Sequence, residues 1–144
     1  MKQQVGISGT GRIGRLLIRK AFTTGIPGAQ VRAINSTSPI GTVAHLLKYD
    51  TVHGQWDADI RVEKDMLAIN GQPVAFVSER DPALLPWGEY GIDIAIDATG
   101  KFNDRAGAAR HLAAGAGRVV VTAPGQDLDL TVVMGVNEAS YDPD

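Results

Sequence analysis

The stretch that decides the fold is V5-G6-I7-S8-G9-T10-G11-R12-I13-G14-R15, directly after a short polar N-terminus. Three of its glycines stand as G-x-G-x-x-G, at Gly9, Gly11 and Gly14. Glycine is a poor helix former. Apolar side chains nevertheless recur at helical spacing from the middle of the motif onward: Ile13, Leu16, Leu17 and Ala21. The pattern predicts a strand, a tight turn and a helix, with side chains missing at the three glycine positions for a reason other than helix formation.

Each glycine of the motif has a separate use in a strand-turn-helix unit. We expect Gly9 to permit the tight turn, Gly11 to let a phosphate approach the backbone, and Gly14 to let the helix pack closely on the strand. The free amides and the positive dipole end of the new helix attract a pyrophosphate. A glycine turn of purely structural use is the alternative. In this context the motif predicts a dinucleotide-binding site.

The rest of the chain alternates strands with helices. Strands are expected over 4–7, 30–34, 92–97, 119–122 and 130–136, and helices over 12–23, 41–49 and 104–114, the last capped by Asn103. Between them, short alternating runs around N70-G71 predict an antiparallel hairpin insert. The order predicts an α/β fold of the Rossmann type, a doubly wound and mostly parallel sheet. Its ligand edge would carry the turns after Ile7, Ile34 and Asp97.

Composition narrows the class of protein. The 144 residues fit one domain, the formal net charge is -2, and there is no basic patch for nucleic acid and no apolar run of membrane length. We therefore expect a cytoplasmic protein. With no cysteine, the chain has no thiolate nucleophile or zinc thiolate. The spacing of His45, His53 and His111 matches no metal motif, so no catalytic or metal site is predicted. Asp97 is expected to bond loop amides and Trp87 to pack.

The second strand ends without the carboxylate that holds an adenosine ribose in many dinucleotide sites. The segment reads Asn35, Ser36, Thr37, so hydroxyl groups stand where a carboxylate would repel a 2′-phosphate. This favours NADP slightly over NAD. The alternatives are dual use or an ordinary polar loop. No arginine for a 2′-phosphate is adjacent in sequence, and Arg80 could arrive only through folding.

Five segments, in order along the chain, carry a resemblance to a known family. They are G9-T10-G11-R12-I13-G14-R15, A44-H45-L46-L47-K48-Y49-D50-T51-V52-H53-G54, E79-R80-D81-P82, L85-P86-W87-G88-E89 and V133-M134-G135-V136-N137. Together they closely resemble phosphorylating glyceraldehyde-3-phosphate dehydrogenase, from the first strand to the last residues. A98-T99-G100-K101-F102-N103 and T122-A123-P124-G125 look most like its bacterial NADP-preferring, gluconeogenic branch.

The resemblance implies an enzyme that oxidises an aldehyde reversibly, with phosphate and NAD(P), through a cysteine thioester. It also implies cofactor contacts, which are carried over by matching position. They comprise the pyrophosphate turn (Gly9, Gly11, Arg12, Ile13, Gly14), the adenosine ribose (Asn35, Ser36, with Thr37 beside them), the adenine (Arg80), the length of the cofactor (Thr99, Gly100, Phe102) and the nicotinamide end (Thr122). A homotetrameric parent protein is a further implication.

Two departures from the family's pattern stand out. Ser8 and Thr10 occupy positions where the family usually has Asn and Phe, and the smaller Thr10 is expected to loosen packing near the pyrophosphate or adenine. The family's cysteine follows the last strand, so residues 1–144 are expected to form the NAD(P)-binding domain alone, inactive without a catalytic domain. The alternatives are an erythrose-4-phosphate dehydrogenase cofactor domain, or a non-catalytic nucleotide-binding module.

Overall fold

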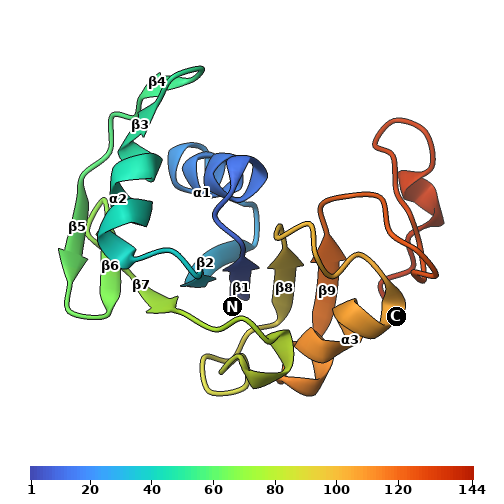
Figure 1. Cartoon of the computed structure of the whole chain (residues 1–144). Coiled ribbons are helices and arrows are strands. Elements are labelled where there is room, and N and C mark those ends of the chain that lie inside the picture. The colour runs from blue at the N-terminus through green and yellow to red at the C-terminus, as the bar shows by residue number, and fades with distance from the viewer.

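In the computed structural model, which describes residues 1–144, β1 (Gln3–Ser8) lies within a seven-stranded sheet of order β5-β6-β7-β2-β1-β8-β9. β1 pairs in parallel with β2 (Ala29–Asn35) and β8 (Ile94–Asp97), and β9 (Arg118–Val121) extends the sheet beyond β8. The carboxyl ends of these strands therefore reach one edge of the sheet (Figure 1). The predicted doubly wound, mostly parallel architecture is confirmed.

The predicted antiparallel insert is also present, and it is joined to the main sheet. β5 (Ile60–Glu63), β6 (Met66–Ile69) and β7 (Gln72–Val77) form an antiparallel meander. Asn70 and Gly71 both have positive φ, 51° and 79°, as a tight I′-type hairpin requires. β7 then pairs in parallel with β2. A small ribbon of β3 (Tyr49–Asp50) and β4 (Gly54–Gln55) lies apart.

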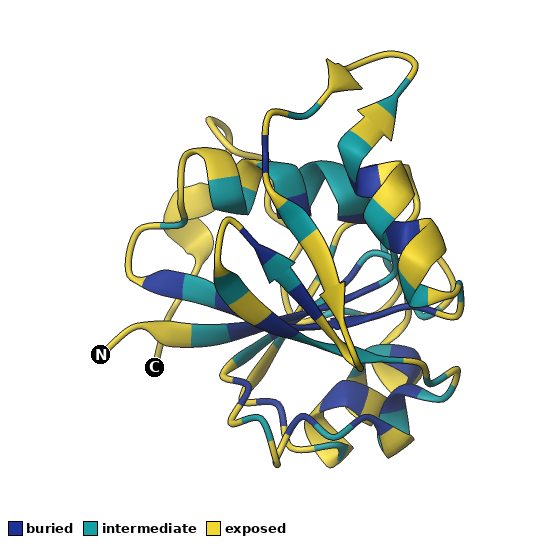
Figure 2. Ribbon diagram, turned by 90° about the vertical axis from the view of Figure 1, so that its left-hand side faces the viewer, coloured by how far each residue is buried: buried dark blue, intermediate teal, exposed yellow.

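Helices cover both faces of the sheet. α1 (Arg12–Thr23) and α2 (Ile40–Lys48) lie on one face, and α3 (Arg105–Ala113) with the 3-10 turn η1 (Pro82–Leu84) lies on the other (Figure 1). Burial follows this layering, because the central strands are dark blue and the outward helix faces are yellow in Figure 2. Trp87 fills the core on the α3 side. None of the helices is long and apolar enough to cross a lipid bilayer.

Two local predictions are wrong. Residues 130–136 form no strand, because their polar groups are bonded locally: Val133 N donates to the Asn137 side chain, whose amide donates to Thr131 O. The chain instead turns there and reaches the short helix η2 (Glu138–Ser140). The cap of α3 is Asp104, which accepts from Gly107 N at 2.7 Å, rather than Asn103. Ile13, which the resemblance assigned to the pyrophosphate turn, is 49% exposed in the first turn of α1 and stands outside the apolar core.

Candidate functional site

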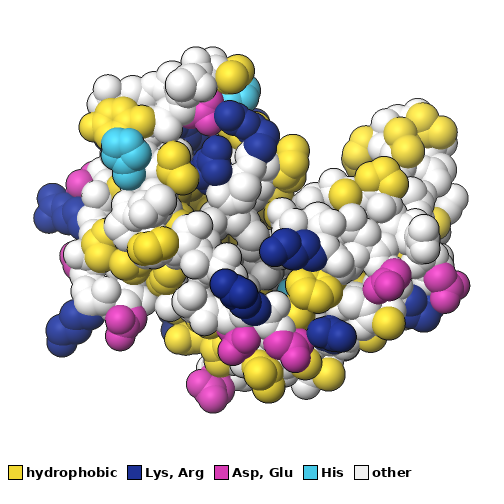
Figure 3. Space-filling view, viewed as in Figure 1, with side chains coloured by type: hydrophobic (Ala, Val, Ile, Leu, Met, Phe, Trp, Pro, Cys, Tyr) yellow, Lys and Arg dark blue, Asp and Glu magenta, His cyan; other side chains and the backbone are white.

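The three turns singled out in the sequence meet at one edge of the sheet. Ser8, the last residue of β1, is paired with Asn35 on one side and Asp97 on the other. Gly9 N donates to Asn35 O at 2.9 Å, and Ala98 N donates to Ser8 O at 2.7 Å. The surface above these strand ends is hollowed (Figure 3). The hollow lies between α1 and the C-terminal segment that follows β9, residues 122–144. This edge is the candidate site.

The three motif glycines have different surroundings. Gly9 has φ +102°, and a Cβ there would stand 2.7 Å from the carbonyl carbon of Ala98. A Cβ on Gly14 would stand 1.9 Å from Gly9 O, so the helix can approach the turn only through a glycine. A Cβ on Gly11 would meet nothing within 4 Å. Gly9 and Gly14 are therefore required by packing, whereas Gly11 leaves open space in front of the backbone, as a phosphate group would need.

The N-terminus of α1 is open to an anion. Its cap residue, Gly11, provides no side-chain hydrogen bond, and the first turn contains no acidic residue. The guanidinium of Arg12 pairs with Asp50, the last residue of β3. Backbone amides of His53 and Val52, together with Arg12, lower the pKa of Asp50 to about 2 despite partial burial. Arg12 is thus held beside the helix start as half of an ion pair, while the helix amides remain unoccupied.

At the end of β2, Asn35 acts as a brace. Its side-chain amide donates to Ser8 Oγ at 3.0 Å and to Glu79 O at 2.9 Å, and its carbonyl accepts from Glu79 N at 2.9 Å. Both amide hydrogens are therefore used inside the protein. The ribose contact expected of Asn35 is not available to its side-chain N–H groups in this arrangement, and the brace instead fixes the loop that follows β7.

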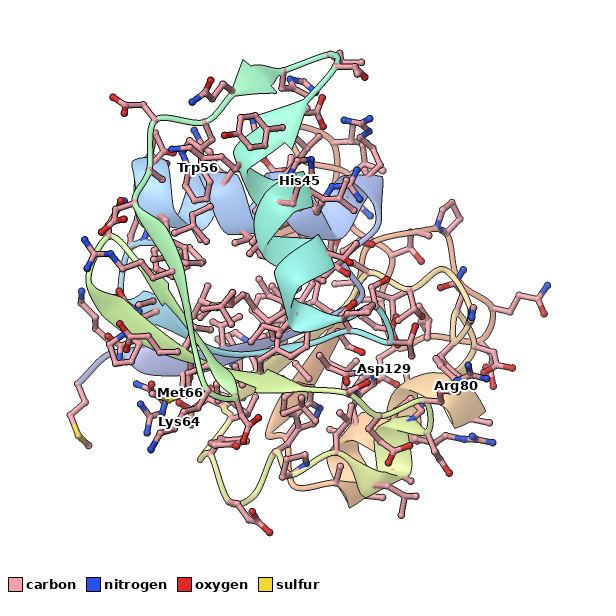
Figure 4. All side chains as sticks on the ribbon, turned by 60° about the vertical axis from the view of Figure 1, so that its left-hand side comes forward. His45, Trp56, Lys64, Met66, Arg80 and Asp129 are labelled. Atoms are coloured by element: carbon pink, nitrogen blue, oxygen red, sulfur yellow. The ribbon has the colours of Figure 1, made fainter.

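That loop brings Arg80 to the candidate site. Ser36 N donates to Val77 O at 2.9 Å, so the chain leaves β7 beside the end of β2. Arg80 follows directly after the braced Glu79, and its exposed side chain makes no ion pair or hydrogen bond in the structure (Figure 4). Folding therefore places a free cation beside the 35–38 segment, which sequence spacing alone did not show.

Ser36 is buried, only 5% exposed, and its hydroxyl has partners. Its Oγ lies 2.5 Å from Thr10 Oγ1 and accepts from Ser38 N at 3.2 Å. Thr37 is exposed beside it. Two of the three residues that depart from the expected patterns, Thr10 and Ser36, are thus bonded to each other. The sequence analysis treated them separately and missed this link.

A buried hydrogen-bonded chain supports the end of β8. Asp97 accepts from Thr99 N at 2.9 Å and Thr99 Oγ1 at 2.7 Å through Oδ1, while its Oδ2 lies 2.8 Å from His111 Nε2. Trp87 Nε1 donates to His111 Nδ1 at 2.9 Å, so His111 Nε2 carries the proton and donates to Asp97. Burial raises the pKa of Asp97, but the bonds from His111 and Thr99 outweigh it and leave the pKa lowered.

The predicted roles of Asp97 and Trp87 are confirmed, since Asp97 bonds a loop amide and Trp87 packs in the core. The part played by His111 was missed. A histidine on a weakly amphipathic helix offers little sequence signal, because its partners are 14 and 24 residues away.

The remaining predicted residues separate into two groups. Thr122 N donates to Asp97 O at 3.1 Å, so Thr99, Gly100 and Thr122 surround the ends of β8 and β9. Phe102 instead packs toward α3, where the Arg110 guanidinium lies 5.7 Å from its ring centre. The structure therefore brings Phe102 against the helix rather than into the group of turns.

Comparisons with known proteins agree with this geometry. Residues 3–105 match the family model described as glyceraldehyde 3-phosphate dehydrogenase, NAD binding domain. The chain is 48% identical over 143 residues to a glyceraldehyde-3-phosphate dehydrogenase of Geobacillus stearothermophilus, and 49% identical over 142 residues to glyceraldehyde-3-phosphate dehydrogenase 2 of Bacillus subtilis. Each match covers 99% of this chain but only 42% and 41% of the respective relative.

Proposed function

Because this chain belongs to the glyceraldehyde-3-phosphate dehydrogenase family and matches its NAD-binding domain, we propose that the hollow over β1, β2 and β8 binds a nicotinamide dinucleotide. The observation that carries the proposal is the contrast among the motif glycines. Gly9 and Gly14 are enclosed, but Gly11 faces open space at an uncapped helix start. The pyrophosphate fits there, where the helix amides and dipole favour negative charge.

We propose that the cofactor is NADP in preference to NAD. No carboxylate ends β2, so no acidic side chain of that strand repels a 2′-phosphate. The exposed Arg80 lies on the loop braced by Asn35, and its free guanidinium can pair with a phosphate in two-pronged geometry. Thr99, Gly100 and Thr122 would line the nicotinamide half. Phe102 would support this half from its place against α3.

We also propose that the chain serves a phosphorylating glyceraldehyde-3-phosphate dehydrogenase, assembled as a homotetramer in the cytoplasm. The bound nicotinamide would accept the hydride from the aldehyde substrate. The 144 residues contain no cysteine, so the thioester nucleophile would have to come from a further domain. The present chain would hold the dinucleotide, orient its nicotinamide end and contribute no group to the acyl chemistry.

Calorimetric titration of the chain with NAD and NADP, in parallel at one fixed ionic strength, tests this function. Saturable 1:1 binding is expected, with NADP the tighter ligand. The Gly11→Ala variant should bind either dinucleotide at least about tenfold more weakly, since its added methyl group enters only the proposed pyrophosphate space. Absence of binding by either dinucleotide would refute the proposed site. Tighter binding of NAD would refute only the NADP preference.

A further inference from the structure

The hydroxyl pair Thr10–Ser36 joins two parts of the chain that both border the proposed cofactor site. Thr10 lies within the glycine turn and Ser36 follows β2, 26 residues later, with the two oxygens 2.5 Å apart. The contact is part-buried, and Ser36 has only 5% of its surface exposed. A side-chain bond therefore crosses directly from the pyrophosphate turn to the expected ribose position.

The hydroxyl hydrogens of this pair can be counted. Each hydroxyl has one hydrogen to donate and two lone pairs to accept with, and one of the two hydrogens occupies the shared bond. Ser36 Oγ also accepts from Ser38 N at 3.2 Å. If Thr10 donates, Ser36 has accepted two hydrogen bonds and its own hydrogen must point elsewhere. If Ser36 donates, the Thr10 hydrogen is the free one. In both arrangements one unshared hydroxyl hydrogen remains.

We propose that Thr10 is a specificity-determining residue, which acts with Ser36 as a single neutral donor for the 2′-phosphate of NADP. This inference rests on the proposed function. A phosphate oxygen is a strong, charged acceptor for the unshared hydrogen, whereas the 2′-hydroxyl of NAD offers a weaker, uncharged acceptor. The Arg80 guanidinium provides positive charge from the neighbouring loop, and the hydroxyl pair provides a hydrogen-bond donor of fixed orientation.

The proposal makes the two hydroxyls interdependent. Removal of either one destroys the shared bond and leaves the other to reorient, so their effects on NADP affinity should not add. A merely structural role for Thr10 would instead weaken NAD and NADP by the same factor, because both cofactors share the glycine turn. The ratio of the two affinities therefore separates specificity from structure.

Calorimetric titration of Thr10→Val, Ser36→Ala and the double variant with each dinucleotide tests the proposal. Thr10→Val should lower NADP affinity roughly fivefold, the worth of one net hydrogen bond, and leave NAD within about twofold. The double variant should bind NADP no more weakly than Ser36→Ala alone. Thr10→Ser, which keeps the hydroxyl, should restore the wild-type ratio. Thr42→Val, an exposed change of the same chemistry on α2, should not alter it.

An unchanged affinity ratio in Thr10→Val would overturn the inference, as would strictly additive losses in the double variant. Either result, with the wild-type chain still binding a dinucleotide, would leave the cofactor site itself standing. A wild-type chain that binds neither dinucleotide would overturn both the cofactor site and the role of Thr10. The wild-type chain is therefore titrated before any variant.

Discussion

Substituting alanine at Gly11 and at Gly14 should separate space kept for a ligand from space required by packing. At Gly14 the new methyl group would stand 1.9 Å from Gly9 O. Unbonded carbon and oxygen atoms keep about 3.3 Å apart, so the helix start or the turn must shift by roughly 1.4 Å. Overpacking of this kind against backbone costs roughly 3 kcal/mol, and the better helix propensity of alanine returns about 1 kcal/mol.

Gly14→Ala should therefore lower the free energy of unfolding by about 2 kcal/mol and the Tm by roughly 6 °C for a chain of this size. At Gly11 the same methyl group meets no atom within 4 Å, and φ is -72°, which alanine adopts readily. The stability cost of Gly11→Ala should stay below about 1 kcal/mol, the difference between glycine and alanine at a helix cap. Its dinucleotide affinity should nevertheless fall at least about tenfold, because a charge-assisted bond is lost.

Urea melts of the two variants without ligand, followed by calorimetric titration with NADP, measure both effects. The expected pattern is a stable Gly11→Ala that binds poorly and a destabilised Gly14→Ala. Full dinucleotide affinity in Gly11→Ala would refute the assignment of the open space to the pyrophosphate. Wild-type stability in Gly14→Ala would refute the argument from close approach.

Three further predictions concern the buried polar groups. The folded pKa of Asp97 lies below its ordinary 3.8, so its stabilisation is present above that pH and is lost as the pH falls toward the folded value; urea melts from about pH 5 to about pH 2 should show a steeper loss in wild type than in Asp97→Asn, and equal slopes would contradict this assignment. Trp87→Phe leaves His111 Nδ1 buried without its donor and should cost about 1–3 kcal/mol of unfolding free energy in thermal or urea melts, whereas a negligible change would show that the bond is not needed. Asn35→Ala should cost about 2–3 kcal/mol and speed amide exchange at Glu79, and continued protection of that amide by NMR would argue against the brace.

Much of the fold followed from local patterns. The glycine spacing predicted the strand, turn and helix at residues 4–23, and N70-G71 predicted a hairpin whose two central residues indeed have positive φ. These predictions succeed because glycine conformation and helical periodicity are properties of neighbouring residues. Residues 130–136 were misread because their apolar spacing does not show that the Asn137 side chain bonds the backbone of Thr131 and Val133, which turns the chain there.

The candidate site divides in the same way. The sequence alone predicted which strand ends form the site, the space for a phosphate at Gly11 and the absence of a carboxylate after β2. Each of these depends on the residue type at a fixed offset from a strand end. Only the tertiary structure joined Thr10 to Ser36, Asn35 to the loop of Arg80, and Trp87 through His111 to Asp97. These bonds link residues 14 to 44 positions apart, and their geometry is decided by the packing of whole strands and helices rather than by any local preference.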